Sequence, residues 1–222
     1  MNWQAFSVSL QLGVLVVVLL LPLGIAAGRA LAAHPFRGRG LVEAALALPL
    51  VLPPTVLGFY FLAGAGHGSA VGTLYRELFG SQLVFSFEAL VIASMIVNIP
   101  FAVQPVQRAF EAIPREIREA AACCRMSLWQ SFWQIELPLA WPGILTAAVL
   151  TFAHTLGEFG VVLMVGGNIP GETRTLSIAI YDEMQAFNMD LAGRMSALLL
   201  AVSMITIAVS HVLSSRIGRR HV

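Results

Sequence analysis

The chain is organised around one polar stretch, Glu119-Ala-Ala-Ala-Cys-Cys-Arg-Met-Ser-Leu-Trp-Gln-Ser-Phe-Trp-Gln-Ile-Glu-Leu-Pro138, which apolar segments flank on both sides. Its acid and three alanines favour a first short helix. After a break at Arg125-Met126-Ser127, helical spacing predicts a second helix with one apolar face, made of Leu128, Trp129, Phe132, Trp133 and Ile135. We expect Pro138 to end this second helix, because proline disfavours helical backbone at the residue before it.

The spacing alone leaves two interpretations of this stretch open. Two short helices, one with a bulky aromatic face, suit insertion into a groove of another protein. The same pattern is typical of an amphipathic helix that lies on lipid.

The composition is that of a membrane protein. Hydrophobic residues make up 58% of the 222 residues and charged residues 11%, whereas about a quarter of a soluble domain is charged. We predict a single transmembrane domain over residues 1–222, with membrane lipid as a partner and no nucleic acid. The chain has no lysine, which excludes a GxxxxGK[ST] phosphate loop, so any ATP that drives it binds to another subunit.

Five apolar stretches have the roughly 20 residues that a membrane-spanning helix needs. They cover about residues 6–27, 41–65, 84–104, 141–165 and 195–213. No basic residue precedes Arg29, so we interpret the first as a retained span rather than a cleaved signal peptide. Pro49, Pro53 and Pro54 predict a kink or break in the second span.

The arginines predict the orientation of these spans. Five crossings place ten arginines on the side of the 119–138 stretch and three on the other. The ten are Arg29, Arg37, Arg39, Arg108, Arg115, Arg118, Arg125, Arg216, Arg219 and Arg220, and the three are Arg76, Arg174 and Arg194. Because positive loops stay in the cytoplasm, we expect an external N-terminus and a cytoplasmic C-terminus.

A long loop at 166–193 should lie on the outer side. Asn168-Ile-Pro-Gly171 is a turn signal. Thr173 or Thr175 is a candidate cap for a following helix along the membrane surface, whose apolar face we predict from Leu176, Ala179, Ile180, Met184 and Phe187.

His154 and Glu158 lie at i and i+4 in the fourth span and so share a helix face. Ionisable residues inside a membrane are functional candidates, here for a proton relay or catalysis. We favour a structural pair in which Glu158 ties helices together or meets backbone groups at the broken Gly157–Gly160 segment. Neither the histidines nor the adjacent Cys123 and Cys124 show metal-ligand spacing, so we expect no metal site.

The central stretch resembles a known family. Glu119-Ala120-Ala121, followed by Ile135-x-Leu137-Pro138, resembles the cytoplasmic "EAA" loop of ATP-binding-cassette (ABC) importer permeases. The resemblance implies a coupling loop at about 108–138 that docks on an ATPase subunit through the EAA residues and the aromatic face. Arg125 stands where that family usually has glycine.

Three further segments resemble the molybdate branch of these permeases: Leu48-Pro-Leu-Val-Leu-Pro-Pro-Thr-Val-Leu-Gly58, Leu156-Gly-Glu-Phe-Gly160 and Gly167-Asn-Ile-Pro-Gly-Glu-Thr-Arg-Thr175. The Gly-Asn-Ile-Pro part is also similar to sulfate permeases. The resemblance implies an all-α bundle of about five transmembrane helices with the type I ABC importer permease fold. It further implies an inner-membrane homodimer, a pair of ATPase subunits that bind ATP and Mg, and an extracytoplasmic molybdate-binding protein.

The resemblance implies a non-enzymatic permease, without a cofactor of its own, that moves molybdate and possibly tungstate. The alternatives are a permease for sulfate or another oxyanion, and a proton-coupled transporter or membrane enzyme that uses His154 and Glu158. A dianion needs donors that replace water without holding it too tightly. The candidate path residues are Thr55, Asn98, Thr151 and Thr155. For Arg174 at the outer mouth two roles are open, steering of the anion and contact with the binding protein, and we favour the contact.

Overall fold

The structure is a computed structural model that describes residues 1–33 and 36–218; the side chains of 210, 211 and 213–218 are not described. His34, Arg219, Arg220 and the side chain of Arg216, all considered above, lie outside the described part.

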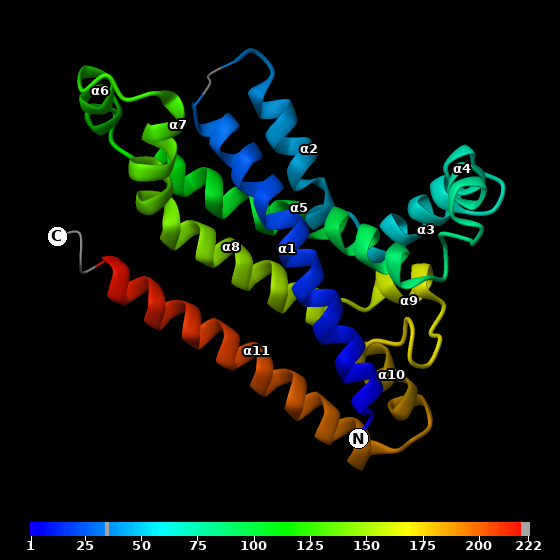
Figure 1. The fold of residues 1–222 in the computed structure, drawn as a ribbon. Helices are drawn as coiled ribbons and strands as arrows, with labels where there is room; N and C mark the ends of the chain where they lie inside the picture. Colours follow the sequence, from blue (N-terminus) through cyan, green and yellow to red (C-terminus); the bar gives the residue numbers. More distant parts are fainter. Residues whose placement is uncertain (34–35, 219–222) are drawn as a thin grey trace.

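The described residues form helices joined by loops, with no strand among them (Figure 1). The helices are α1 (Trp3–Ala33), α2 (Arg39–Val51), α3 (Pro54–Ala65), α4 (Ala70–Phe79), α5 (Phe87–Glu111), α6 (Arg115–Cys123), α7 (Leu128–Ser131), the π-helical turn η1 (Phe132–Glu136), α8 (Leu137–Gly157), α9 (Gly160–Gly166), α10 (Leu176–Gln185) and α11 (Met189–Gly218).

Four helical segments of the described chain are long and apolar enough to cross a membrane: α1, α5, Leu128–Gly157 and Met189–Val209. The pair α2 and α3 passes the same test together but is bent by 107°, so up to five spans are present. The predicted all-α bundle of about five spans is therefore confirmed, and the predicted break in the second span lies at Leu52 and Pro53.

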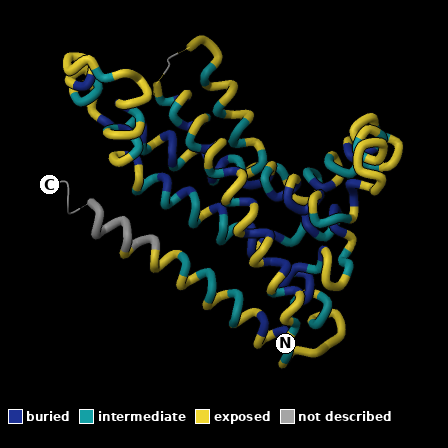
Figure 2. Tube along the Cα trace, in the orientation of Figure 1, coloured by how far each residue is buried: buried dark blue, intermediate teal, exposed yellow. Residues whose placement is uncertain are grey.

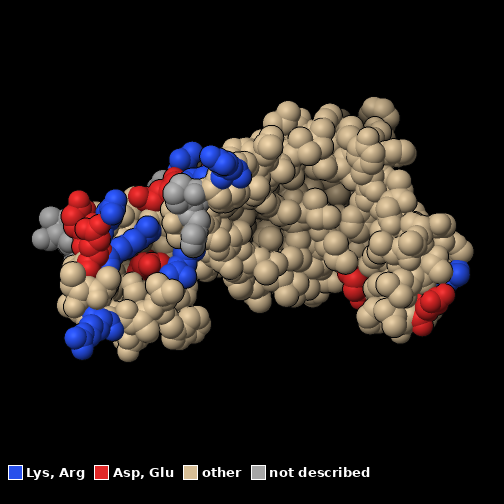
Figure 3. All heavy atoms as spheres, turned by 90° about the horizontal axis from the view of Figure 1, so that it is seen from above, with Lys and Arg blue, Asp and Glu red and all other residues tan. Residues whose placement is uncertain are grey.

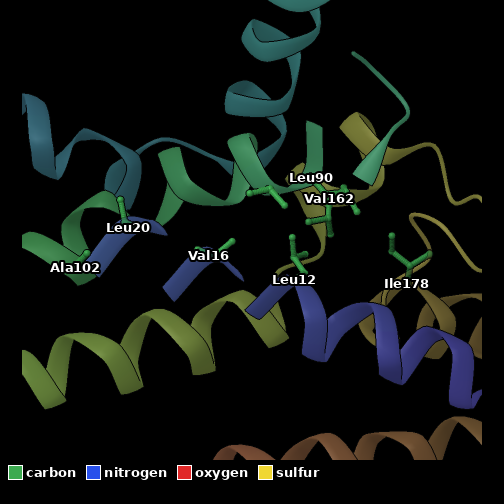
Figure 4. Close-up of a cluster of buried hydrophobic side chains, with 8 residues drawn as sticks. Leu12, Val16, Leu20, Leu90, Ala102, Val162 and Ile178 are labelled. Atoms are coloured by element: carbon green, nitrogen blue, oxygen red, sulfur yellow. The ribbon is translucent and has the colours of Figure 1, made fainter. Parts of the chain in front are cut away.

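The core is built where α1, α5 and α8 pack together. Leu12, Val16 and Leu20 of α1 point into a buried cluster with side chains of α5, α9 and α10 (Figure 4). The helix backbones approach closely, since a Cβ added at Gly24 would lie 2.9 Å from the carbonyl oxygen of Ala102 on α5. By contrast α11 runs along the outside and is largely exposed or half-buried (Figure 2).

Charged residues gather at the two ends of the molecule, and a broad uncharged surface separates them (Figure 3). The helices α6 and α7 and the C-terminal end of α11 lie at one end, whereas the N-terminus and α10 lie at the other (Figure 1). This arrangement is the one that a protein crossing an apolar membrane layer requires.

The expectation that Pro138 ends the second helix is wrong. The helix continues from α7 through η1 into α8, so that Leu128–Gly157 forms one segment of 30 residues. Pro138 is the second residue of α8 and directly follows the π turn. The π turn before it is wider, with the N–H of Leu137 bonded to the carbonyl of Phe132, which leaves room for the proline ring.

The predicted outer helix is present as α10, with two corrections. Thr175 occupies the N-cap position but makes no capping hydrogen bond, and Thr173 instead closes the preceding loop through Ile169 N and Gly166 O. The predicted apolar face holds for Leu176 and Ala179, which are buried, but fails for Met184 and Phe187, which are 50% and 86% exposed. Phe187 follows the helix in a left-handed conformation (φ +59°), which turns it off the face.

Candidate functional site: an exposed aromatic face and a buried polar cluster

A tight turn joins α6 to α7. The N–H of Met126 bonds to the carbonyl of Ala121, and the N–H of Arg125 bonds to Ala122, which is the Schellman pattern of a helix C-terminus. Arg125 takes the left-handed conformation at φ +57°, which costs a non-glycine residue about 1–2 kcal/mol. The turn therefore has the backbone geometry that suits a glycine, although arginine occupies it.

The helix α7 begins with a capping box. Ser127 Oγ accepts from the N–H of Gln130, and the Gln130 side chain accepts from the N–H of Ser127. The cap fixes the direction in which the following aromatic side chains point.

The predicted apolar face of this segment divides in two. Leu128, Trp129 and Trp133 are 84%, 69% and 50% exposed; we call these three residues the exposed aromatic face. Phe132 instead turns inward and stacks on the buried Phe110. Because exposed apolar patches on the surface mark contact sites, this face is available to a partner.

The EAA residues on α6 have different environments. Glu119 is exposed and pairs with Arg115 at 2.6 Å, Ala120 is exposed and Ala121 is buried. In the segment that follows, Ile135 and Leu137 are half-buried and Pro138 is exposed. Of the predicted coupling residues, Glu119, Ala120, Trp129, Trp133 and Pro138 are thus exposed.

A polar cluster lies between α5 and α8. The side-chain amide of Asn98 donates to Ser94 O at 2.8 Å and to Thr155 Oγ1 at 3.1 Å. Its Oδ1 lies 3.2 Å from His154 Nδ1 and accepts there, so Nδ1 carries the proton. Thr155 in turn donates to the carbonyl of Thr151 at 2.7 Å, so that the side chains of Asn98, His154 and Thr155 connect the two helices.

Glu158 closes the break between α8 and α9. Its Oε1 accepts from the N–H of Val161 at 3.2 Å, and its backbone carbonyl accepts from Ser177 Oγ of α10 at 2.7 Å. Its Oε2 lies 3.9 Å from His154 Nε2. A carboxylate at the start of a helix satisfies a free N–H and meets the positive end of the helix dipole.

The two broken helices meet. A Cβ added at Gly160, the first residue of α9, would lie 2.8 Å from Cβ of Pro54, the first residue of α3. The chain interruptions at Leu52–Pro53 and at Glu158–Phe159 are therefore neighbours in space.

The structure does not bring all the candidate path residues together. Asn98, Thr151 and Thr155 are at most 2% exposed between α5 and α8, whereas Thr55 is exposed in the first turn of α3. Arg174 lies before α10, where its Nε donates to Asn168 Oδ1 at 2.7 Å. Sequence reasoning missed two contributors, Ser94 and Ser177, since neither stands in a motif. Within the described residues no group of three histidine, cysteine or acidic side chains is placed to hold a metal ion.

Comparison with known proteins identifies the family. Residues 20–219 match the family described as binding-protein-dependent transport system inner membrane component. The molybdenum transport system permease protein ModB of Azotobacter vinelandii is 48% identical over 82% of this chain and 80% of that protein. ModB of Escherichia coli strain K12 is 36% identical over 98% of this chain and 95% of that protein. A sulfate transport system permease protein, CysW of Synechococcus elongatus, is 31% identical over 98% of this chain and 76% of that protein.

The fold has a close counterpart among solved structures. A chain of a bacterial ABC transporter involved in the import of the polysaccharide alginate superposes with a TM-score of 0.76 at 18% identity, over 96% of this chain and 78% of that chain. This likeness confirms the type I ABC importer permease fold predicted from the sequence. The chain belongs to the binding-protein-dependent transport system inner membrane components, multi-pass, non-catalytic subunits that work with a separate binding protein and ATPase.

Proposed function

We propose that the chain is the permease subunit of an ATP-driven importer that moves molybdate, with tungstate as a near-equal substrate. The observation that carries the proposal is the 48% identity to a molybdenum permease over most of both chains. Sulfate permeases are more distant at 31% identity, which favours molybdate over the sulfate alternative.

The working unit in this proposal is a homodimer with two ATPase subunits on the cytoplasmic side and a molybdate-binding protein outside. Support for a second copy comes from α2, none of whose residues is buried. Leu48 and Val51 of α2 are exposed, and so are Phe59 and Tyr60 of α3, at 59% and 66%. Large apolar side chains exposed in this way need either lipid or a partner helix to cover them.

We assign ATPase coupling to residues 108–138 within one permease domain of residues 1–222. The exposed aromatic face enters the ATPase groove, and the movement reaches α8 because α7, η1 and α8 form one continuous helical segment. At the far end of α8 lies the break at Glu158, next to the α2–α3 break. Movement of the loop thereby displaces both breaks, and transport proceeds by alternating access.

In this proposal, the hydroxyl groups that contact the substrate belong to residues that are exposed on the surface of a single chain. Thr55 fits this role because it is exposed beside the two breaks. Asn98, Thr151 and Thr155 are buried in this arrangement and contribute to the path only if the helices move apart. Arg174 at the outer mouth is assigned to the binding protein.

A proton relay through His154 and Glu158 is the less favoured alternative. Glu158 already holds the N–H of Val161, and His154 Nδ1 is engaged by Asn98. Both side chains thus have structural partners, which supports a structural pair.

Growth and uptake test the substrate assignment. Deleting the gene should impair molybdenum-dependent enzymes at low external molybdate, and high molybdate should restore them. Reconstituted complex should hydrolyse ATP faster when binding protein and molybdate or tungstate are present, but not with sulfate. A deletion strain that grows normally on trace molybdate and starves for sulfate would refute the proposal.

A further inference from the structure

One arginine of α1 holds both ends of the π turn η1. Arg29 Nε donates to Oε2 of Glu136, the last residue of η1, at 2.6 Å. The Cζ atom of the same guanidinium lies 4.7 Å from the ring centroid of Phe132, the first residue of η1, within the range of a cation–π contact. Arg29 thus contacts the first and the last residue of the five-residue turn, through two different kinds of interaction.

The partners of Arg29 are inside the protein. Glu136 is 8% exposed, and a carboxylate so far from water is strongly disfavoured without a cation beside it. The ring of Phe132 also stacks on Phe110 of α5, which is completely buried. The turn is therefore held from two sides, by α1 through Arg29 and by α5 through Phe110.

The helix α1 packs closely on α5 next to Arg29. A Cβ added at its neighbour Gly28 would lie 2.9 Å from both the backbone nitrogen of Gln107 and Cγ1 of Val106 on α5. The two helices accordingly leave no free space between them at this level, and displacement of η1 is passed on to α1 and α5 together.

The π turn is the point at which the exposed aromatic face can change its direction. It contains a hydrogen bond from Leu137 N to Phe132 O, five residues back. Such turns are rare and frequently lie at functional sites. If η1 rewound into an ordinary α-helix, the side chains of Trp129 and Trp133 would turn by about 100° relative to α8, the rotation of one residue.

We propose that Arg29 is a positioning residue for energy coupling: by holding Phe132 and Glu136, it keeps η1 in its π form and makes the exposed aromatic face move as one body with α1, α5 and α8. The inference rests on the coupling role proposed above. It adds that coupling depends on a contact between the π turn and α1, in addition to the exposed aromatic face itself.

The test measures ATP hydrolysis and molybdate uptake in the same proteoliposomes, with permease, ATPase and binding protein. Arg29→Gln should retain the ATPase subunit on purification but lower the uptake per ATP hydrolysed by at least about fivefold. Phe132→Leu, which keeps the ion pair and removes the ring, should give a smaller loss. The exchange Arg29→Glu with Glu136→Arg should restore part of what either single change removes.

Arg37→Gln is the matched control, because Arg37 is exposed in the segment between α1 and α2 and lies outside residues 108–138. It should leave the uptake per ATP unchanged. The proposal would be overturned if the Arg29→Gln complex showed the wild-type uptake per ATP hydrolysed. It would also be overturned if the uptake per ATP of the exchange variant were no higher than that of Arg29→Glu alone. Loss of the ATPase subunit in the conservative Arg29→Lys variant would assign Arg29 to assembly instead. Absence of molybdate uptake in the wild-type complex would refute the proposed substrate, not the role of Arg29.

Discussion

Pro54 and Gly160 touch at the point where two interrupted helices meet, since a Cβ added at Gly160 would lie 2.8 Å from the Cβ of Pro54. Each residue begins the second half of its broken helix, α3 or α9. Freed backbone groups within a membrane must be covered by neighbouring protein. This contact brings the starts of the two half-helices together, although Pro54 and Thr55 at the start of α3 stay exposed in the single chain.

Gly160→Ala should therefore damage the contact. The added methyl group enters an occupied space, and such overpacking typically costs about 1–3 kcal/mol. We expect a lower Tm of the purified permease and reduced uptake. Gly157→Ala is the matched control, because a Cβ there has nothing within 4 Å and the break is the same. Equal Tm values for the two variants would contradict the close contact.

The pair His154 and Glu158 gives a second prediction. Glu158→Ala leaves the N–H of Val161 without its acceptor and should cost about 1–3 kcal/mol of stability. Glu158→Gln keeps an oxygen at that place, so its Tm should fall less, and His154→Asn should retain most transport. The measurement is Tm together with uptake at several pH values. A pH-dependent step of uptake that disappears in Glu158→Gln at unchanged Tm would favour the proton relay.

The sequence predicts best those features that one residue type controls locally. Proline at 49, 53 and 54 was enough to expect the break in the second span, and the 107° bend is found there. The resemblance to the EAA loop marks Arg125 as standing at a glycine position, and its φ of +57° is one that glycine adopts freely. Both features follow from the backbone limits of single residues.

Contacts between distant residues could not be predicted in the same way. Asn98 and Thr155 are 57 positions apart, and their hydrogen bond depends on how α5 packs on α8. The inward turn of Phe132 depends equally on Phe110 and Arg29. Helical spacing placed Phe132 near Trp129, and their ring centroids lie 6.1 Å apart, but spacing alone could not show that Phe132 packs against Phe110 while Trp129 stays exposed.

Reporter fusions test the orientation. The ten-to-three arginine distribution predicts that the α6–α7 end lies in the cytoplasm. A reporter that is active only in the cytoplasm should give signal when it is fused at Val222 and none when it is fused at Gly80, which follows α4. The reverse result would invert the orientation and place the exposed aromatic face outside, away from any ATPase.

The exposed aromatic face yields the last prediction. Trp129 and Trp133 are in edge-to-face contact at 5.4 Å, so they form one anchor rather than two separate side chains. Replacing both with alanine should weaken ATPase binding by at least about 2 kcal/mol, the scale of an interface hot spot. That loss is roughly a 30-fold increase in Kd, since each 1.4 kcal/mol is tenfold. The measurement is ATPase binding to permease in nanodiscs, together with hydrolysis stimulated by molybdate and the binding protein.

Trp3→Ala is the control for this double variant. Trp3 is 62% exposed, but it lies in the first turn of α1, at the opposite end of the molecule from α7 (Figure 1). It should leave ATPase binding unchanged, although it removes as large a ring. Glu119→Arg tests the acid of α6: reversing its charge should also abolish stimulated hydrolysis, because Glu119 belongs to the proposed coupling segment and its ion pair with Arg115 is exposed. Full stimulation and an unchanged Kd in the double tryptophan variant would mean that this face lies on lipid, the alternative that its spacing allows.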